Sequence, residues 1–204
     1  MFIDSTSIIN LKGNTGSETE FECGTPDNFL NDFNRAACIE EYKISLGDQK
    51  KLYDLHYKKV DIESWPNPPD DLKLLIITEP WCGDSTAIIP VLQKLFEDSN
   101  VKIRILRRDT NPGLMDRFLT NGGRAIPVVI ILDEDGNYLG RFGPRPEKAR
   151  QIFEDHREDI INGEIEKQEV TRKIRTFYAK DKGRAILSDF YQVINKIYAG
   201  KITS

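Results

Sequence analysis

Residues 72–85 read LKLLIITEPWCGDS, and this stretch decides the fold. Its first half is a short apolar run of leucines and isoleucines, which is typical of a β-strand buried on both faces. Pro80 ends the strand, and a helix is predicted to begin at Asp84 or Ser85, because both residue types are common N-terminal caps. Cys82 then lies on the turn between strand and helix. We therefore expect its sulfur at the positive end of a helix dipole, where a thiolate is favoured.

The turn and three later segments resemble the thioredoxin family. Residues 81–85 are similar to the Trp-Cys-Gly-Pro-Cys active site, with Asp84 in place of the proline and Ser85 in place of the second cysteine. The further matches follow in the family's order and approximate spacing at residues 109–113, 123–129 and 140–143. The resemblance covers residues 72–160, a little under half of the chain.

This resemblance implies an α/β fold of the thioredoxin type, in which helices flank a mixed central sheet. The hydrophobic pattern over residues 72–160 independently predicts the element order βαβαββα. By the resemblance, Ile126-Pro127 matches the cis-proline that faces the redox cysteine, and Gly143 matches the turn glycine beside the substrate groove. A cis bond would turn the backbone of Ile126 toward Cys82, ready to pair with an extended substrate segment.

Helical patterns lie on both sides of the thioredoxin-like segment. We expect an N-terminal helical extension at residues 1–66, a thioredoxin-like domain at 67–162 and a C-terminal helical extension at 163–204. Thr25 and Pro26 predict the start of a helix that continues to about Ile39. The apolar faces of both extensions must be covered. Packing against the thioredoxin-like core is the first interpretation, and a dimer interface is the second.

Neighbouring groups have opposing effects on the pKa of Cys82. The helix N-terminus and the Ser85 hydroxyl favour the thiolate, whereas the nearby Asp84 carboxylate disfavours it. Because these effects are of similar size, we expect a pKa moderately below the ordinary value of about 8.5. Ser85 cannot attack a mixed disulfide, so the motif lacks a resolving thiol.

The candidate site is built around this motif. The catalytic candidates are Cys82, Ser85, Trp81, Gly83 and Asp84, and the substrate-binding candidates are Ile126, Pro127, Gly143 and Arg124. With Arg141 and Arg145, Arg124 is expected to rim the Cys82 groove, where guanidinium groups could hold the carboxylates of a small acidic thiol such as glutathione. Plain surface charge is the other interpretation of these arginines.

Three neighbouring positions bear on proton transfer. Dithiol thioredoxins bury an acidic residue and a lysine beneath the active site, and by position these correspond here to Ile76 and Ile105. Glu79 precedes the turn and is expected to be solvated rather than to act as a base.

Composition limits the partners and the compartment. The chain has 204 residues, 30% of them charged, and a formal net charge of −4. This acidity disfavours binding to nucleic acid or to an anionic membrane, and no apolar run is long enough for a membrane helix. Three cysteines at scattered positions and no visible signal segment favour a reducing cytoplasm. No metal-ligand spacing or cofactor motif is apparent, so we expect no cofactor.

Two functions fit this sequence. The first is a monothiol thiol-disulfide oxidoreductase with a role in redox homeostasis. Cys82 would attack a protein disulfide or a low-molecular-weight partner such as glutathione, and an external thiol would resolve the intermediate. The second is a non-catalytic module that binds a protein or peptide in the same groove. The acidity of Cys82 and its ability to form a mixed disulfide discriminate between them.

Overall fold

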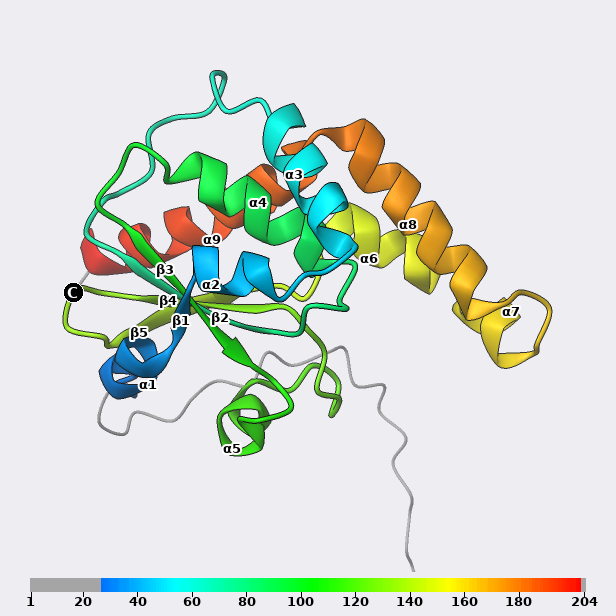
Figure 1. Cartoon of the computed structure of the whole chain (residues 1–204), viewed down its shortest axis with the longest axis horizontal. Coiled ribbons are helices and arrows are strands. Elements are labelled where there is room, and N and C mark those ends of the chain that lie inside the picture. The colour runs from blue at the N-terminus through cyan, green and yellow to red at the C-terminus, as the bar shows by residue number, and fades with distance from the viewer. Residues whose placement is uncertain (1–26, 203–204) are drawn as a thin grey trace, which may run out of the picture.

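A five-stranded mixed sheet forms the centre of the computed structural model, which describes residues 27–202 (Figure 1). The strand order is β1-β3-β2-β4-β5. The strands are β1 (Ala37–Cys38), β2 (Lys73–Thr78), β3 (Lys102–Arg107), β4 (Val128–Leu132) and β5 (Tyr138–Phe142). β2 and β3 run parallel, and the other three pairs are antiparallel. The arrangement is the mixed, helix-flanked sheet that the sequence predicts.

The neighbouring strands β2 and β4 are buried on both faces, as their continuous apolar sequences predict. Ile76 in β2 lies between Ile105 of β3 and Val129 of β4, and all three side chains are buried. Ile76 and Ile105 therefore provide apolar packing beneath the motif.

Helices cover both faces of the sheet but do so unequally (Figure 1). One face carries most of the helical mass, and the other carries two short helices and a 3₁₀ turn. The larger layer contains α2 (Ile39–Ile44), α3 (Gln49–Lys59), α4 (Ser85–Leu95), α6 (Glu147–Glu154), α8 (Lys167–Asp181) and α9 (Arg184–Ile202). The smaller layer contains α1 (Leu30–Arg35), α5 (Pro112–Met115) and the turn Asp116–Phe118. α7 (Arg157–Ile161) lies beyond the sheet, beside the first turns of α8.

The C-terminal helices share the main hydrophobic core. Val170, Ile174 and Tyr178 of α8 and Phe190 of α9 belong to the same buried cluster as Ile76. Gly183 joins the two helices at φ +83°, and a Cβ there would meet the side chain of Val91 in α4 at 2.8 Å. A residue without a side chain is thus required where this junction packs on α4.

Two helix predictions need correction. The helix expected to continue to Ile39 ends at Arg35, because Ala36 is extended and Ala37–Cys38 pair with β3 as an edge strand. Its expected start at Thr25 and Pro26 lies outside the described residues. The single last helix of the predicted order βαβαββα is divided into α6 and α7, with Asp155 and His156 between them. Within residues 27–202, no helix is both long enough and apolar enough to cross a membrane.

Candidate active site at Cys82

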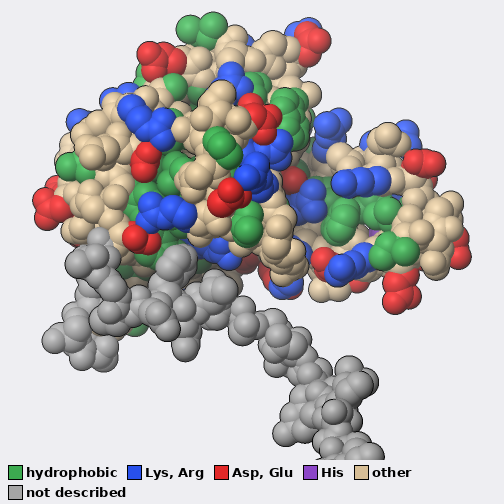
Figure 2. Space-filling view, turned by 90° about the horizontal axis from the view of Figure 1, so that it is seen from below, with side chains coloured by type: hydrophobic (Ala, Val, Ile, Leu, Met, Phe, Trp, Pro, Cys, Tyr) green, Lys and Arg blue, Asp and Glu red, His purple; other side chains and the backbone are tan. Residues whose placement is uncertain are grey.

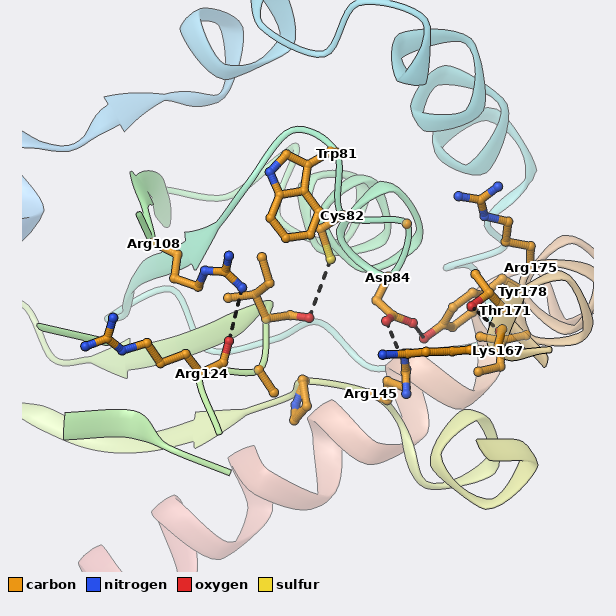
Figure 3. A pocket seen from close by; sticks show the side chains of 15 residues that line it. Trp81, Cys82, Asp84, Arg108, Arg124, Arg145, Lys167, Thr171, Arg175 and Tyr178 are labelled. Carbon is orange, nitrogen blue, oxygen red and sulfur yellow. Dashed lines mark hydrogen bonds and ion pairs between the residues drawn. The ribbon is translucent and has the colours of Figure 1, made fainter. Parts of the chain in front are cut away.

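The chain places Cys82 where β2 passes into α4. β2 ends at Thr78, and Cys82 donates its backbone N–H to the Glu79 carbonyl in the turn that follows. The residue is 6% exposed. Its thiol lies 3.5 Å from the carbonyl oxygen of Ile126, to which it donates a hydrogen bond (Figure 3). The Ile126-Pro127 bond is cis, as the resemblance predicts.

Burial dominates the acidity of this thiol. It raises the pKa of Cys82 above its ordinary value, and the Asp84 carboxylate acts in the same direction. A hydrogen bond from the Ser85 hydroxyl and the backbone N–H groups of Ser85 and Asp84 lower the pKa, but they do not compensate. The expectation of a lowered pKa is therefore wrong. The neighbouring groups shift the pKa in the expected directions, but desolvation of the sulfur outweighs the hydrogen bonds that lower it.

Asp84 links the motif to α8 and to the loop after β5. Its carboxylate accepts a hydrogen bond from Arg145 Nε at 2.9 Å and another from the Tyr178 hydroxyl at 3.0 Å. Burial, together with the adjacent carboxylate, raises the pKa of Tyr178, so the phenol stays protonated and can donate. The ion pair with Arg145 and the bond from α8 hold Asp84 in place and partly neutralise it.

A cavity of about 390 Å³ opens in front of Cys82. Five cationic side chains from the described part of the chain line it, and Asp84 is the one acidic residue among those described residues. The cationic residues are Arg108, Arg124, Arg145, Lys167 and Arg175. Trp81 lies at the rim, 56% exposed, with the Arg108 guanidinium 5.0 Å from its ring centre. The cavity is thus basic although the chain as a whole is acidic.

A family model described as "Thioredoxin" matches residues 45–158, more than half of the chain. The chain belongs to this thioredoxin family. The match includes the Cys82 turn, the Ile126-Pro127 bond and the strands that carry them. It ends before α8, so the helix that provides Tyr178 lies outside the region that defines the family.

Two solved structures share the thioredoxin-like fold. An HIV epitope scaffold is 18% identical with a TM-score of 0.63, and the match covers 83% of this chain and 99% of that one. A protein of unknown function from Pseudomonas aeruginosa is 18% identical with a TM-score of 0.59, covering 86% of this chain and 99% of that one. At this level of identity the likeness concerns the fold alone.

The predicted site residues fall into two groups. Trp81, Cys82, Gly83, Asp84, Ile126 and Arg124 line the cavity. Ser85, Pro127 and Gly143 are not part of this lining. Ser85 is fully buried and shares a hydrogen bond with the Thr78 hydroxyl. Gly143 has a φ of +108°, and its Cα lies so close to the Pro127 carbonyl that a Cβ there would overlap the oxygen.

The arginines expected around Cys82 do not act as a group. Arg145 lies in the cavity but is bound to Asp84. Arg124 pairs with Asp116 through two hydrogen bonds of 2.7 and 2.8 Å, and its guanidinium points away from Cys82 (Figure 3). Arg141 is not part of the lining and donates to the Leu119 carbonyl at 3.2 Å. The expectation that all three surround Cys82 is thus wrong for Arg141.

Glu79 also differs from expectation. Instead of being solvated, it is 6% exposed and forms an ion pair of 3.1 Å with Arg107. Its second carboxylate oxygen accepts the backbone N–H of Asp109 at 2.9 Å. Glu79 therefore connects the turn after β2 to the end of β3 and the loop that follows it.

Sequence reasoning missed the contribution of α8. Lys167, Thr171, Arg175 and Tyr178 all reach the cavity, although they lie more than 80 positions after Cys82. The signal available was the spacing of Lys167, Thr171 and Arg175 by four residues, which places them on one side of a helix. The spacing does not show which part of the protein this side of the helix faces.

Proposed function

We propose that this protein is a monothiol thiol-disulfide oxidoreductase in which Cys82 is the nucleophile. The observation that carries the proposal is the position of the Cys82 sulfur, at an open cavity and within 3.5 Å of the Ile126 carbonyl. A disulfide in the cavity could approach the sulfur from the side that the protein leaves open. Membership of the thioredoxin family supports this use of the scaffold.

The exchange takes place in two steps. Cys82 first loses its proton to solvent, and the thiolate attacks one sulfur of a disulfide. The substrate S–S bond breaks, a mixed disulfide with Cys82 forms, and the departing thiolate takes a proton from water. A second, external thiolate then attacks the substrate sulfur of the mixed disulfide and releases Cys82 as a thiolate. Ser85 cannot perform this second attack, because its hydroxyl is a far weaker nucleophile at neutral pH.

The protonated state of Cys82 sets the rate of the first step. Only the thiolate reacts, and burial raises the pKa of Cys82. The reaction should therefore be slow at neutral pH and accelerate as the pH rises. The hydrogen bond from Ser85 acts toward the thiolate and supports a role for this residue in holding the anion once it forms.

The partner is a protein disulfide or a low-molecular-weight thiol such as glutathione, and the setting is a reducing cytoplasm. The described cysteines, Cys38 and Cys82, are both free, which agrees with such a compartment. Trp81 and Ile126 line the cavity at the sulfur and are the proposed substrate contacts. Pro127 follows Ile126 and is packed closely against Gly143, which supports the position of this segment.

A second candidate is a non-catalytic binding module on the same cavity. The low exposure of Cys82 and its raised pKa favour this alternative, because a thiol that remains protonated is a poor nucleophile. In this case Cys82 would act as a small apolar residue that donates to Ile126.

Turnover of a neutral disulfide separates the two candidates. The Cys23→Ser, Cys38→Ser variant would be assayed with hydroxyethyl disulfide and an external thiol between pH 7 and 9. We expect a rate above the spontaneous reaction that rises with pH and disappears when Cys82→Ser is added. A rate equal to the spontaneous reaction at every pH would leave the binding module as the function.

A further inference from the structure

One side of α8 faces the Cys82 cavity. Lys167, Thr171 and Arg175 recur every four residues and all line the cavity, together with Ile174 and Tyr178 of the same helix. Figure 2 shows Lys and Arg side chains around the hollow between the main body and the end of the molecule formed by α7 and α8. Because α8 lies outside residues 45–158, family membership does not account for this surface.

The cationic residues of the cavity differ in whether their charge is already compensated. Arg145 is paired with Asp84, Arg108 with Asp109 and Arg124 with Asp116. Among residues 27–202, neither Lys167 nor Arg175 has an ion-pair partner. The α8 side of the cavity thus carries two positive charges that no described residue compensates, on a chain whose net charge is −4.

Arg175 brings one of these charges to the motif itself. Its Nε and Nη2 atoms lie 3.3 and 3.4 Å from the position that a Cβ on Gly83 would occupy. The guanidinium therefore covers the residue that follows Cys82 in the chain. A planar guanidinium binds carboxylates and phosphates through paired N–H groups. The Thr171 hydroxyl one turn away donates to the Lys167 carbonyl at 3.0 Å, so the donors of this side are Lys167 and Arg175.

We infer that Lys167 and Arg175 form an anion subsite that holds the acidic groups of a small disulfide while its sulfur meets Cys82. This inference rests on the proposed function, because it names the substrate class of the same site. A cavity of about 390 Å³ has the size of a small-molecule pocket rather than of a folded partner. Compounds with phosphate groups share the required charge, so the ligand must be tested against them.

The first experiment measures binding without chemistry. Full-length protein with Cys82→Ser would be titrated with oxidised glutathione by calorimetry, and then with inorganic phosphate and ATP. We expect oxidised glutathione to bind and the combined Lys167→Ala, Arg175→Ala change to weaken it at least tenfold. Arg172→Ala is the matched control, since Arg172 lies on the same helix but is exposed and outside the cavity. It should leave the affinity unchanged.

A kinetic experiment provides a second readout on the reactive protein. Cys82 would be alkylated with iodoacetate, which is anionic, and with iodoacetamide, which is neutral and of similar size. An anion subsite raises the rate ratio of iodoacetate to iodoacetamide, and this ratio should fall in the Lys167→Ala, Arg175→Ala variant and at high salt. The ratio also corrects for any change in the pKa or accessibility of the thiol.

Each outcome decides the inference separately from the proposed function. Glutathione binding that the Lys167→Ala, Arg175→Ala variant loses supports the subsite, even if Cys82 then fails to turn over hydroxyethyl disulfide. Absence of binding, an equal loss in Arg172→Ala, or an unchanged alkylation ratio overturns it, even if Cys82 does react with the neutral disulfide. Tighter binding of phosphate or ATP than of oxidised glutathione overturns the assignment to an acidic disulfide.

Discussion

Replacing Gly143 by alanine should destabilise the protein more than any other alanine substitution at a glycine near the site. Gly143 has a φ of +108°, and a Cβ there would overlap the Pro127 carbonyl oxygen. The positive φ costs on the order of 1–3 kcal/mol for a residue with a side chain. Relieving the overlap requires backbone movement, because a carbonyl cannot rotate away as a flexible side chain can, and this adds about 1–3 kcal/mol.

The sum is a loss of roughly 2–6 kcal/mol in the free energy of unfolding. For a chain of this length, each kcal/mol lowers Tm by about 2–4 °C, so the total shift should be roughly 4–24 °C. Thermal unfolding followed by circular dichroism measures the shift. Urea unfolding then gives the free energy on the same samples.

Gly163 is the matched control for the Gly143 prediction. It also has a positive φ, +73°, but a Cβ added to it would have nothing within 4 Å. Gly163→Ala should therefore cost only the conformational part, about 1–2 kcal/mol. Equal Tm shifts for Gly143→Ala and Gly163→Ala would refute the reasoning, because they would show that Gly143 has no tight contact with Pro127.

The remaining predictions concern the motif and its link to α8. Tyr178→Phe removes a hydrogen bond to the partly buried Asp84 carboxylate and should lower the free energy of unfolding by about 1.5–3 kcal/mol, which urea unfolding would detect; no change would mean that Arg145 alone holds Asp84. As the pH rises through the ordinary cysteine pKa of about 8.5, the unfolded chain loses the Cys82 proton before the folded protein does, so wild-type stability should fall with pH more steeply than that of Cys82→Ser. Parallel curves would show that burial does not raise the pKa of this thiol. Ser85→Cys supplies a resolving thiol and should increase insulin reduction substantially; an unchanged rate would point to the apolar Ile76 beneath the motif as the limit.

The sheet and the motif could be predicted because their signals are local. The apolar runs that became β2 and β4 are strands buried on both faces, and such runs predict strands without knowledge of their neighbours. The resemblance to thioredoxins identified the cis bond before Pro127 from the order of a few segments. The edge strand Ala37–Cys38 was missed because two residues carry no periodicity, and only pairing with β3 defines them.

The properties of the cavity were harder to predict, because they depend on contacts between distant segments. The sign of each local field on Cys82 followed from its neighbours, whereas its burial depends on how the surrounding elements close around it. Tyr178 lies 94 positions from Asp84, to which it donates. The position of Arg175 over Gly83 could not be predicted for the same reason. The sequence of α8 indicates a polar side of the helix but not the surface that this side faces.

Formation of a mixed disulfide at Cys82 would show whether its sulfur is a nucleophile in the folded protein. The Cys23→Ser, Cys38→Ser variant would be incubated with excess hydroxyethyl disulfide at pH 8.5 and examined by intact-mass spectrometry, followed by peptide mapping. We expect one adduct per chain, located on Cys82, reversed by an external thiol and formed faster as the pH rises. A protein that stays unmodified while folded, and reacts only after denaturation, would contradict the claim that Cys82 is a nucleophile.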